Sequence, residues 1–200
     1  RPQAEKYFNL GCHMPWIGAR TAQLDHAHVE YCRGIENPIG IKLGPQMTSA
    51  WLAELLERLN PAREKGRIVL IHRFGADKLA QGLPELIRAV QATEHPVVWL
   101  SDPMHGNTHS TADGIKTRDF DAILSEVISA FKIHRDCGSR LGGVHLELTG
   151  ENVTECTGGA RALNADDLKQ RYESQVDPRL NGEQALEPAL AIATAHGRDH

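Results

Sequence analysis

Short apolar runs that end in polar side chains constrain the fold of this chain more than any other feature. Residues 97–100 read V-V-W-L and lead directly into the loop S-D-P-M-H-G-N-T at 101–108. An earlier run, I-V-L-I at 68–71, ends on His72 and Arg73. Continuous runs of this kind are typical of strands that are buried on both faces of a parallel sheet. The carboxyl ends of such strands are where α/β enzymes place their polar chemistry.

Helical patterns separate the apolar runs along most of the chain. We expect strands at residues 38–43, 67–72, 97–100 and 142–148, and a further short strand within 13–18. We expect helices at residues 48–59, 77–93, 118–136, 166–173 and 183–194, and residues 21–34 also allow a helix. Strands that alternate with helices of this length predict a parallel sheet with crossover connections.

The positions of the polar residues favour a barrel over a dinucleotide-binding fold. The sequence has neither a G-x-G-x-x-G after its first strand nor a G-x-x-x-x-G-K-[ST] motif. Because candidate residues follow several strands, a (β/α)8 TIM barrel fits better. A complete barrel needs about 250 residues. We therefore expect the 200 residues to supply roughly its carboxyl-terminal half, about strands 4–8. Residues 1–200 then form one partial catalytic domain, and residues 1–12 are an N-terminal segment of unassigned structure.

The composition excludes some classes of partner. Hydrophobic residues make up 40% of the chain and charged residues 24%, which is ordinary for a soluble globular domain. The net charge of −4 provides no basic field for nucleic acid or acidic lipid. No window approaches the ~18 apolar residues of a membrane span. Four scattered cysteines without a C-x-x-C pair predict free thiols in a reducing compartment, and we expect the cytoplasm.

The expected strand ends and the loop beyond them carry three cations and three residues of metal-ligand type. In chain order they are Arg20, Lys42, Arg73, His105, Glu147 and Asp177. Cations on one face suit a substrate with phosphate and carboxylate groups. One histidine with two carboxylates is typical of a divalent metal such as Mn²⁺, Co²⁺ or Zn²⁺, which could polarise an aldehyde or ketone oxygen. Taken singly, Lys42 or Arg73 could instead be an ion-paired surface residue, and His105 could simply hydrogen-bond within its loop.

Glu147 is harder to explain without a partner. It lies in the apolar run G-G-V-H-L-E-L, where an unpaired carboxylate is costly. Strand alternation places His145 and Glu147 on one side, and Val144, Leu146 and Leu148 on the other. His145 is therefore either a residue that supports the metal ligands from behind or a packed core residue, and the sequence leaves both open.

Six motifs follow one another along the chain. They are I-E-N-P-I-G-I-K-L-G-P (35–45), H-R-F-G-A-D-K (72–78), D-P-M-H-G-N-T (102–108), G-G-V-H-L-E-L-T-G (142–150), V-T-E-C (153–156) and D-P-R-L-N (177–181). Together they resemble class II, plant-type 3-deoxy-D-arabino-heptulosonate 7-phosphate (DAHP) synthases, from about Trp16 to the C-terminus. The resemblance implies a metal-dependent TIM barrel that condenses phosphoenolpyruvate with erythrose 4-phosphate. This is the first reaction of the shikimate pathway to chorismate and the aromatic amino acids.

The resemblance also implies roles for individual residues. The residues that match the family's metal ligands are His105, Glu147 and Asp177, with Mn²⁺ or Co²⁺ favoured over Zn²⁺. The residues that match its phosphoenolpyruvate site are Trp16, Ala19, Arg20, Lys42 and Arg73. Lys116, in G-I-K-T-R, matches an active-site lysine and is counted with both the substrate-binding and the catalytic residues. The catalytic residues implied are Lys42, Arg73, His105 and Lys116.

The chain departs from the family pattern in two ways. It reads W-I-G-A-R where the family usually has W-I-G-E-R or W-I-G-D-R, so Ala19 removes a carboxylate, a loss that class I relatives with G-A-R-T tolerate. The family's first barrel strands, which carry a cysteine ligand and further basic residues, precede anything in this chain. Cys12 lies too close to Trp16 to match that cysteine. We therefore expect a homo-oligomer or association with an N-terminal half.

Three interpretations stay open on the sequence alone. The first is the carboxyl-terminal half of a class II synthase, either truncated or one piece of a split enzyme. The second is a non-catalytic remnant or interaction partner, because half a barrel exposes unpaired strand edges and an apolar face. The third is a DAHP or aminoDAHP synthase of a secondary-metabolite cluster.

Overall fold

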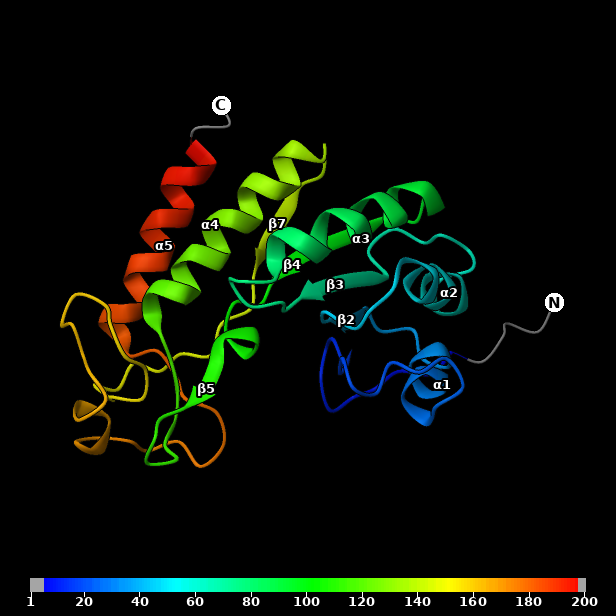
Figure 1. Cartoon of the computed structure of the whole chain (residues 1–200). Coiled ribbons are helices and arrows are strands. Elements are labelled where there is room, and N and C mark those ends of the chain that lie inside the picture. Colours follow the sequence, from blue (N-terminus) through cyan, green and yellow to red (C-terminus); the bar gives the residue numbers. More distant parts are fainter. Residues whose placement is uncertain (1–5, 198–200) are drawn as a thin grey trace.

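Five parallel strands form the central sheet of the protein, of which a computed structural model describes residues 6–197 (Figure 1). In spatial order they are β1 (Trp16–Ile17), β2 (Ile39–Leu43), β3 (Ile68–His72), β4 (Val97–Ser101) and β7 (Leu141–Val144). The helices are α1 (Ala27–Arg33), α2 (Ser49–Leu59), α3 (Leu79–Thr93), α4 (Phe120–Asp136) and α5 (Gly182–Gly197). An antiparallel hairpin consists of β5 (Thr108–Ser110) and β6 (Lys116–Arg118), and short 3-10 turns cover His105–Asn107 and Asp167–Lys169. The predicted parallel α/β sheet is confirmed.

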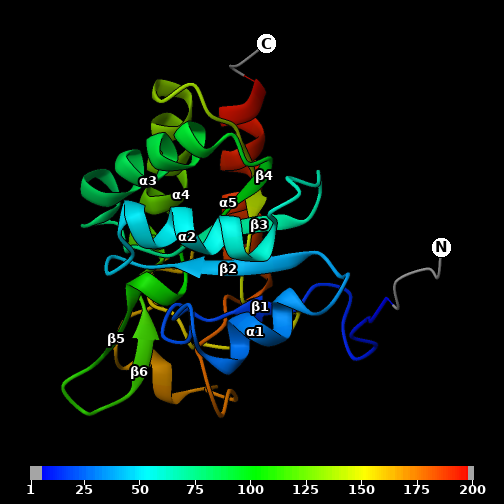
Figure 2. The ribbon, with the colours of Figure 1, turned by 90° about the vertical axis from the view of Figure 1, so that its right-hand side faces the viewer.

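Helices α2, α3 and α4 are drawn above β2 in Figure 2, and α1 and the β5–β6 hairpin are drawn below it. Helix α1 nevertheless contacts α2 and contributes Val29 and Cys32 to the main core. The main core lies between the strands and these helices. It includes the fully buried Ile41 and Leu70 of the strands and Leu55, Leu83 and Ile87 of the helices. Apolar residues at i, i+3 and i+4 give α2 and α3 the face that packs on the sheet. Within residues 6–197, no helix combines the length and the apolar content needed to cross a bilayer.

The sheet is strongly curved, as the contact between side chains from its two edges shows. Trp16 lies in β1 at one edge and His145 directly follows β7 at the other, yet their ring centroids are 5.6 Å apart. An added Cβ at Gly40 would lie 2.8 Å from Trp16 Cβ, so glycine lets Trp16 lie against β2. Trp16, Gly40, Val69 and Val98 are paired in register across β1 to β4 and face the same side of the sheet, and Val98 is 43% exposed. A curved sheet with a partly exposed inner face is consistent with part of a barrel, and the described residues do not close one.

The last strand of the sheet is shorter than the predicted strand at 142–148. β7 ends at Val144, because its neighbour β4 ends at Ser101, whose carbonyl accepts the last bond from His145 N at 2.7 Å. Further along the chain, Leu148 forms an isolated parallel bridge with Leu180 rather than with β4.

The predicted helix at 166–173 is also wrong. Only the single turn Asp167–Lys169 forms there, because local bonds compete with a helix. Asn164 N donates to Asp167 Oδ2 at 2.9 Å, and Thr154 N donates to the carbonyl of Arg171 at 2.9 Å. The segment is therefore tied to the chain around Thr154 rather than wound on itself.

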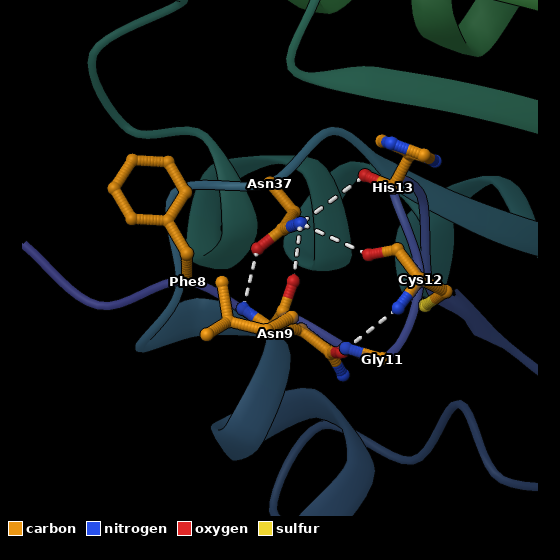
Figure 3. Close-up of a pocket in the computed structure, with 7 residues that line it drawn as sticks. Phe8, Asn9, Gly11, Cys12, His13 and Asn37 are labelled. Carbon is orange, nitrogen blue, oxygen red and sulfur yellow. Dashed lines mark hydrogen bonds between the residues drawn. The ribbon is translucent and has the colours of Figure 1, made fainter.

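The buried side-chain amide of Asn37 makes four of the hydrogen bonds that hold the N-terminal segment (Figure 3). Asn37, just before β2, accepts from Asn9 N at 2.7 Å through its Oδ1. Its Nδ2 donates to the carbonyls of Asn9, Cys12 and His13 at 3.1, 3.3 and 3.2 Å. These bonds fix a segment for which the sequence predicted no structure, and residues 6–12 form neither helix nor strand. Residues 1–5 of the predicted N-terminal segment lie outside the described residues.

Candidate metal centre and anion pocket

The three predicted metal ligands meet at the carboxyl ends of β4 and β7. His105 lies in the turn after β4, Glu147 follows β7, and Asp177 lies in the loop before α5. His105 Nε2 lies 3.2 Å from Glu147 Oε1 and 3.7 Å from Asp177 Oδ2. One potential donor atom from each residue lies within 4.8 Å of the other two. The structure therefore brings together residues that are far apart in the sequence.

Asp102 fixes the orientation of His105. Its buried carboxylate oxygens lie 2.9 and 2.8 Å from His105 Nδ1. Because a carboxylate only accepts, Nδ1 carries the proton and Nε2 faces Glu147 and Asp177. Asp102 also forms an ion pair with Lys42. Burial raises the pKa of Asp102, but the hydrogen bond from His105 and the ammonium of Lys42 outweigh it and hold that pKa well below its ordinary value.

Arg118, the last residue of β6, orients Glu147. Its fully buried guanidinium donates to Glu147 Oε2 at 2.6 Å, to the carbonyl of Pro178, and to Thr108 Oγ1 at 2.8 Å. Burial raises the pKa of Glu147, but hydrogen bonds from His105 and Arg118 outweigh burial and lower it to about 2. The carboxylate is therefore ionised near neutral pH, as a metal ligand must be.

Lys116, at the start of β6, reaches the remaining carboxylate. Its ammonium forms an ion pair with Asp177 Oδ1, while Asp177 Oδ2 faces His105. Side chains alternate along a strand, so Lys116 and Arg118 lie on the same side of the hairpin. Both cations are therefore directed at the carboxylates of the ligand trio.

The donor set fits a divalent cation. One imidazole nitrogen with two carboxylate oxygens is a mixed ligand set of the kind that Mn²⁺, Co²⁺ and Zn²⁺ accept. Hydrogen bonds to Asp102 and Glu147 raise the pKa of His105 to about 9. At this pKa, Nε2 also carries a proton near neutral pH. A metal that binds Nε2 must displace the Nε2 proton, so metal affinity is expected to rise with pH.

A pocket of about 310 Å³ joins the trio to the predicted cations. The residues that line it are Trp16, Gly18, Ala19, Arg20, Thr21, Lys42, Arg73, His105 and Asp177. The predicted site residues that do not line it are Glu147 and Lys116, and each contacts a residue that does. All of the predicted site residues therefore belong to one connected cluster.

Two guanidinium groups at this cluster keep free donors. Arg73 Nη2 donates to the carbonyl of His105 at 2.9 Å, but Arg73 Nε is buried and has no partner among the described residues. Arg118 Nη2 is likewise buried without a hydrogen bond among the described residues, and its ion-pair contact with Asp177 Oδ1 is as long as 4.0 Å. Buried donors without a partner are costly. Their presence favours an anionic ligand, which could accept from them.

Glu126 of α4 accepts hydrogen bonds from the two loops that carry Arg73 and His105. It accepts from the amides of Phe74 and Gly75 at 3.3 Å each and from Asn107 Nδ2 at 2.7 Å. Burial raises its pKa to about 7, against the lowering effect of these bonds. Sequence reasoning did not select Glu126, because a single acidic residue in an amphipathic helix carries no signal of a buried role.

His145 lies between the pocket wall and the ligands. Its ring centroid is 5.6 Å from that of Trp16 and 6.4 Å from that of His105. Burial lowers its pKa, with Lys42 adding to the effect. His145 therefore packs beside the site, and its support of the metal ligands stays a prediction.

The fold and the site define an α/β protein with a candidate metal centre and an anion pocket at the carboxyl ends of parallel strands. Comparison with known sequences gives the family. The chain belongs to the class-II DAHP synthetase family, whose sequence profile matches residues 1–193. The resemblance carried by the six motifs is confirmed.

Three curated relatives share about half of their aligned residues with this chain. A phospho-2-dehydro-3-deoxyheptonate aldolase of Neurospora crassa is 54% identical over 194 residues, which cover 96% of this chain and 40% of the relative. A protein of the same name from Streptomyces coelicolor is 52% identical over 186 residues, 93% of this chain and 41% of the relative. Phospho-2-dehydro-3-deoxyheptonate aldolase AroG of Mycolicibacterium smegmatis is 50% identical over 190 residues, which cover 95% of this chain and 41% of the relative. The chain thus spans about 40% of the length of these relatives.

Proposed function

We propose that this chain contributes the metal centre and most of the phosphoenolpyruvate pocket of a DAHP synthase. The reaction joins C3 of phosphoenolpyruvate to the aldehyde carbon of erythrose 4-phosphate, adds water at C2 and releases phosphate. The observation that carries the proposal is one pocket in which Arg20, Lys42 and Arg73 lie beside His105 and Asp177. Family membership supports the same reaction, since the relatives' names describe enzymes that act on phospho-2-dehydro-3-deoxyheptonate.

The cationic residues and the ligand trio have different roles in the proposed reaction. Lys42, Arg73 and Arg20 are placed to hold the phosphate and carboxylate of phosphoenolpyruvate, and the free Nε of Arg73 offers one more donor. Trp16 and Ala19 complete the pocket wall. A divalent metal held by the ligand trio would act as a Lewis acid on the aldehyde oxygen of erythrose 4-phosphate.

Lys116 is placed to serve the second substrate. It lies beside the trio rather than in the pocket wall, and its ammonium is held by Asp177. Negative charge develops on the aldehyde oxygen as the new carbon–carbon bond forms, and a fixed cation near this position stabilises it. We count Lys42, Arg73, His105 and Lys116 as the catalytic residues.

The barrel itself is part of the proposal. The five described parallel strands would be about strands 4–8 of a (β/α)8 barrel, in one partial domain. The curvature of the sheet and the exposed Val98 on its inner face support this assignment. The remaining strands would come from a further N-terminal part, and the relatives, of which this chain spans about 40%, are long enough to include one. A homo-oligomer would be built on the completed barrel.

A phosphate-release assay tests the activity. The chain, alone and co-expressed with the N-terminal part of a relative, receives phosphoenolpyruvate, erythrose 4-phosphate and Mn²⁺. We expect phosphate release from the co-expressed protein, loss of release in His105→Ala, and wild-type release in His109→Ala. His109 is an exposed histidine of β5 and serves as the matched control. No release from the completed protein under any metal would refute the proposal.

The metal is tested by chelation and refeeding. The proposal expects activity to disappear after chelation and to return with Mn²⁺ or Co²⁺, and with Zn²⁺ to a smaller extent. Activity that survives complete chelation would exclude a metal role for the trio.

A further inference from the structure

We propose that Glu155 and Arg179 are positioning residues that hold the Asp177 loop, residues 173–179, in its metal-binding conformation. The inference rests on the proposed metal site. It gives a role to two sequence motifs, V-T-E-C, which supplies no residue of the proposed site, and D-P-R-L-N, which is otherwise explained only through Asp177.

Glu155 binds both ends of the Asp177 loop through its carboxylate. Oε1 accepts from the amides of Glu173 and Ser174 at 3.0 and 2.8 Å, and Oε2 accepts from the amide of Arg179 at 2.7 Å. The loop begins and ends on the same side chain, so one carboxylate sets the distance between its two ends. Asp177 lies between these anchors.

Arg179 completes the clamp with a two-pronged ion pair. Its Nε lies 3.0 Å from Glu155 Oε2 and its Nη2 lies 2.8 Å from Oε1. Glu155 is fully buried, whereas the Arg179 side chain is 30% exposed. Forked pairs of this type fix orientation as well as distance. With five hydrogen bonds on its two oxygens, Glu155 is committed to the loop and is not itself a metal ligand.

The clamp is anchored to the same hairpin that orients Glu147. Thr117 Oγ1 donates to the backbone carbonyl of Glu155 at 2.8 Å, and Arg118 donates to the carbonyl of Pro178. Within the loop, Ser174 Oγ donates to the carbonyl of Asp177 at 2.6 Å. The position of the Asp177 carboxylate is thus determined from both sides, by Glu155 and by β6.

Metal affinity is the readout that separates positioning from general stability. Mn²⁺ binding is measured on the protein by the electron paramagnetic resonance signal of free Mn²⁺. Residues that orient ligands from behind typically change metal affinity or activity by about 10–100-fold. For Glu155→Gln we expect a loss of about this size. Activity should recover at saturating Mn²⁺, and the KM for phosphoenolpyruvate should stay unchanged, because Lys42 in β2 and Arg73 directly after β3 lie outside the Asp177 loop.

Graded variants keep the test independent of folding failure. Arg179→Lys retains the charge without the fork and should lose less affinity than Arg179→Gln. Glu151→Gln is the matched control, since Glu151 is an exposed acid of the same segment that pairs with Arg171 at 2.8 Å and should leave Mn²⁺ affinity unchanged. In metal-free Glu155→Gln, the amides of Ser174 and Arg179 should exchange hydrogen faster than in the wild type.

Two results would overturn the inference, and they are distinguishable. If the wild type binds Mn²⁺ and both Glu155→Gln and Arg179→Gln bind it equally well, the clamp has no positioning role and the metal site stands. If Asp177→Asn binds Mn²⁺ as tightly as the wild type, Asp177 is not a ligand, and the inference fails together with that part of the proposed function.

Discussion

At the scale of single residues, Asp102 connects the two halves of the site. It forms an ion pair with Lys42 and hydrogen bonds with His105, and its side chain has no exposed surface. Removing one partner of a buried pair leaves an uncompensated charge, which typically costs about 3–5 kcal/mol. We expect Asp102→Asn to lower the free energy of unfolding by about this amount, measured by urea denaturation. Mn²⁺ should also bind less tightly, because His105 loses its orienting acceptor.

The control for this prediction is an aspartate with the same kind of partner in solvent. Asp113 pairs with Lys169 at 2.6 Å, and its side chain is 64% exposed. Asp113→Asn should leave both unfolding and Mn²⁺ binding unchanged, since exposed pairs contribute little. Equal effects of the two substitutions would contradict the buried role of Asp102.

Two buried imidazoles predict a pH-dependent stability. His72 stacks on His134 with ring centroids 5.6 Å apart, and neither ring nitrogen of His72 has a partner among the described residues. Burial, with His134 adding to it, lowers the pKa of His72 to about 3, and burial lowers that of His134 to about 4. The unfolded chain takes up these protons below about pH 6.5, while the folded protein does not. Their contribution to stability is therefore present above pH 6.5 and is lost as the pH falls.

The variant His72→Leu isolates this effect. Protonation of Glu126, whose pKa is raised to about 7, stabilises the folded protein over part of the same range as the pH falls. The pH dependence of the free energy of unfolding of the wild type therefore combines both effects. The stability of His72→Leu relative to the wild type should grow by up to about 1.4 kcal/mol per pH unit between pH 6.5 and 4. Urea denaturation at each pH measures it, and a constant difference would mean that His72 is not held neutral.

Sequence reasoning found the residues that carry charge after strands but missed those that hold them. Asp102 lies in a quoted motif, yet nothing in the sequence shows that it faces both Lys42 and His105. Arg118 was expected as the first residue of a helix, whereas it ends β6 with its guanidinium buried against Glu147. Partners of this kind are set by tertiary approach, which residue types and spacing do not encode.

At the scale of elements, the loops after β3 and β4 depend on two glycines in contact. A Cβ added at Gly106 would lie 2.2 Å from the backbone nitrogen of Gly75, so the loops would have to separate. Overpacking of this kind costs about 1–3 kcal/mol. We expect Gly106→Ala to lower stability by about this amount and to raise the KM for phosphoenolpyruvate, because Arg73 bonds to the carbonyl of His105. Gly150→Ala, with nothing within 4 Å, should change neither quantity.

Elements with strong periodicity could be predicted, and short polar ones could not. The helix predicted at 48–59 is α2, which Thr48 caps by accepting from Trp51 N at 3.2 Å, and α4 covers nearly all of the predicted 118–136. The β5–β6 hairpin was missed because T-H-S and K-T-R have no apolar alternation. Its strands are held by contacts of Lys116 and Arg118 with the site rather than by a hydrophobic face.

At the scale of the whole molecule, the described chain exposes large apolar side chains along α5. Leu186 and Leu190, one turn apart, are 64% and 67% exposed. Such side chains favour association when they lie together. We expect the isolated chain to self-associate and Leu186→Lys with Leu190→Lys to shift it toward monomer in size-exclusion chromatography. Ala193→Lys with Thr194→Lys adds the same two charges at exposed positions of α5 and should not produce this shift.

The parallel sheet could be predicted from the sequence, and the curvature that brings its edges together could not. The order β1-β2-β3-β4-β7 follows from alternating strands and helices. The contact between Trp16 and His145 depends on the accumulated twist and bend of five strands. Periodicity in the sequence specifies which face of each strand is buried but does not specify that bend.

The contacts of the three residues of β6 fix the length of the turn that connects β5 to β6. Lys116 pairs with Asp177, Thr117 bonds to the carbonyl of Glu155, and Arg118 pairs with Glu147, so alternate side chains have assigned partners. Deleting one residue from the surface turn at 111–115 would shift the register by one and send each side chain to the opposite face. Apart from Gly114, whose φ of +82° favours glycine, and Thr111, whose Oγ1 accepts from Ile115 N, this turn should therefore tolerate exchanges of its amino acids while rejecting the insertion or deletion of one residue, although it lies at the periphery of the protein.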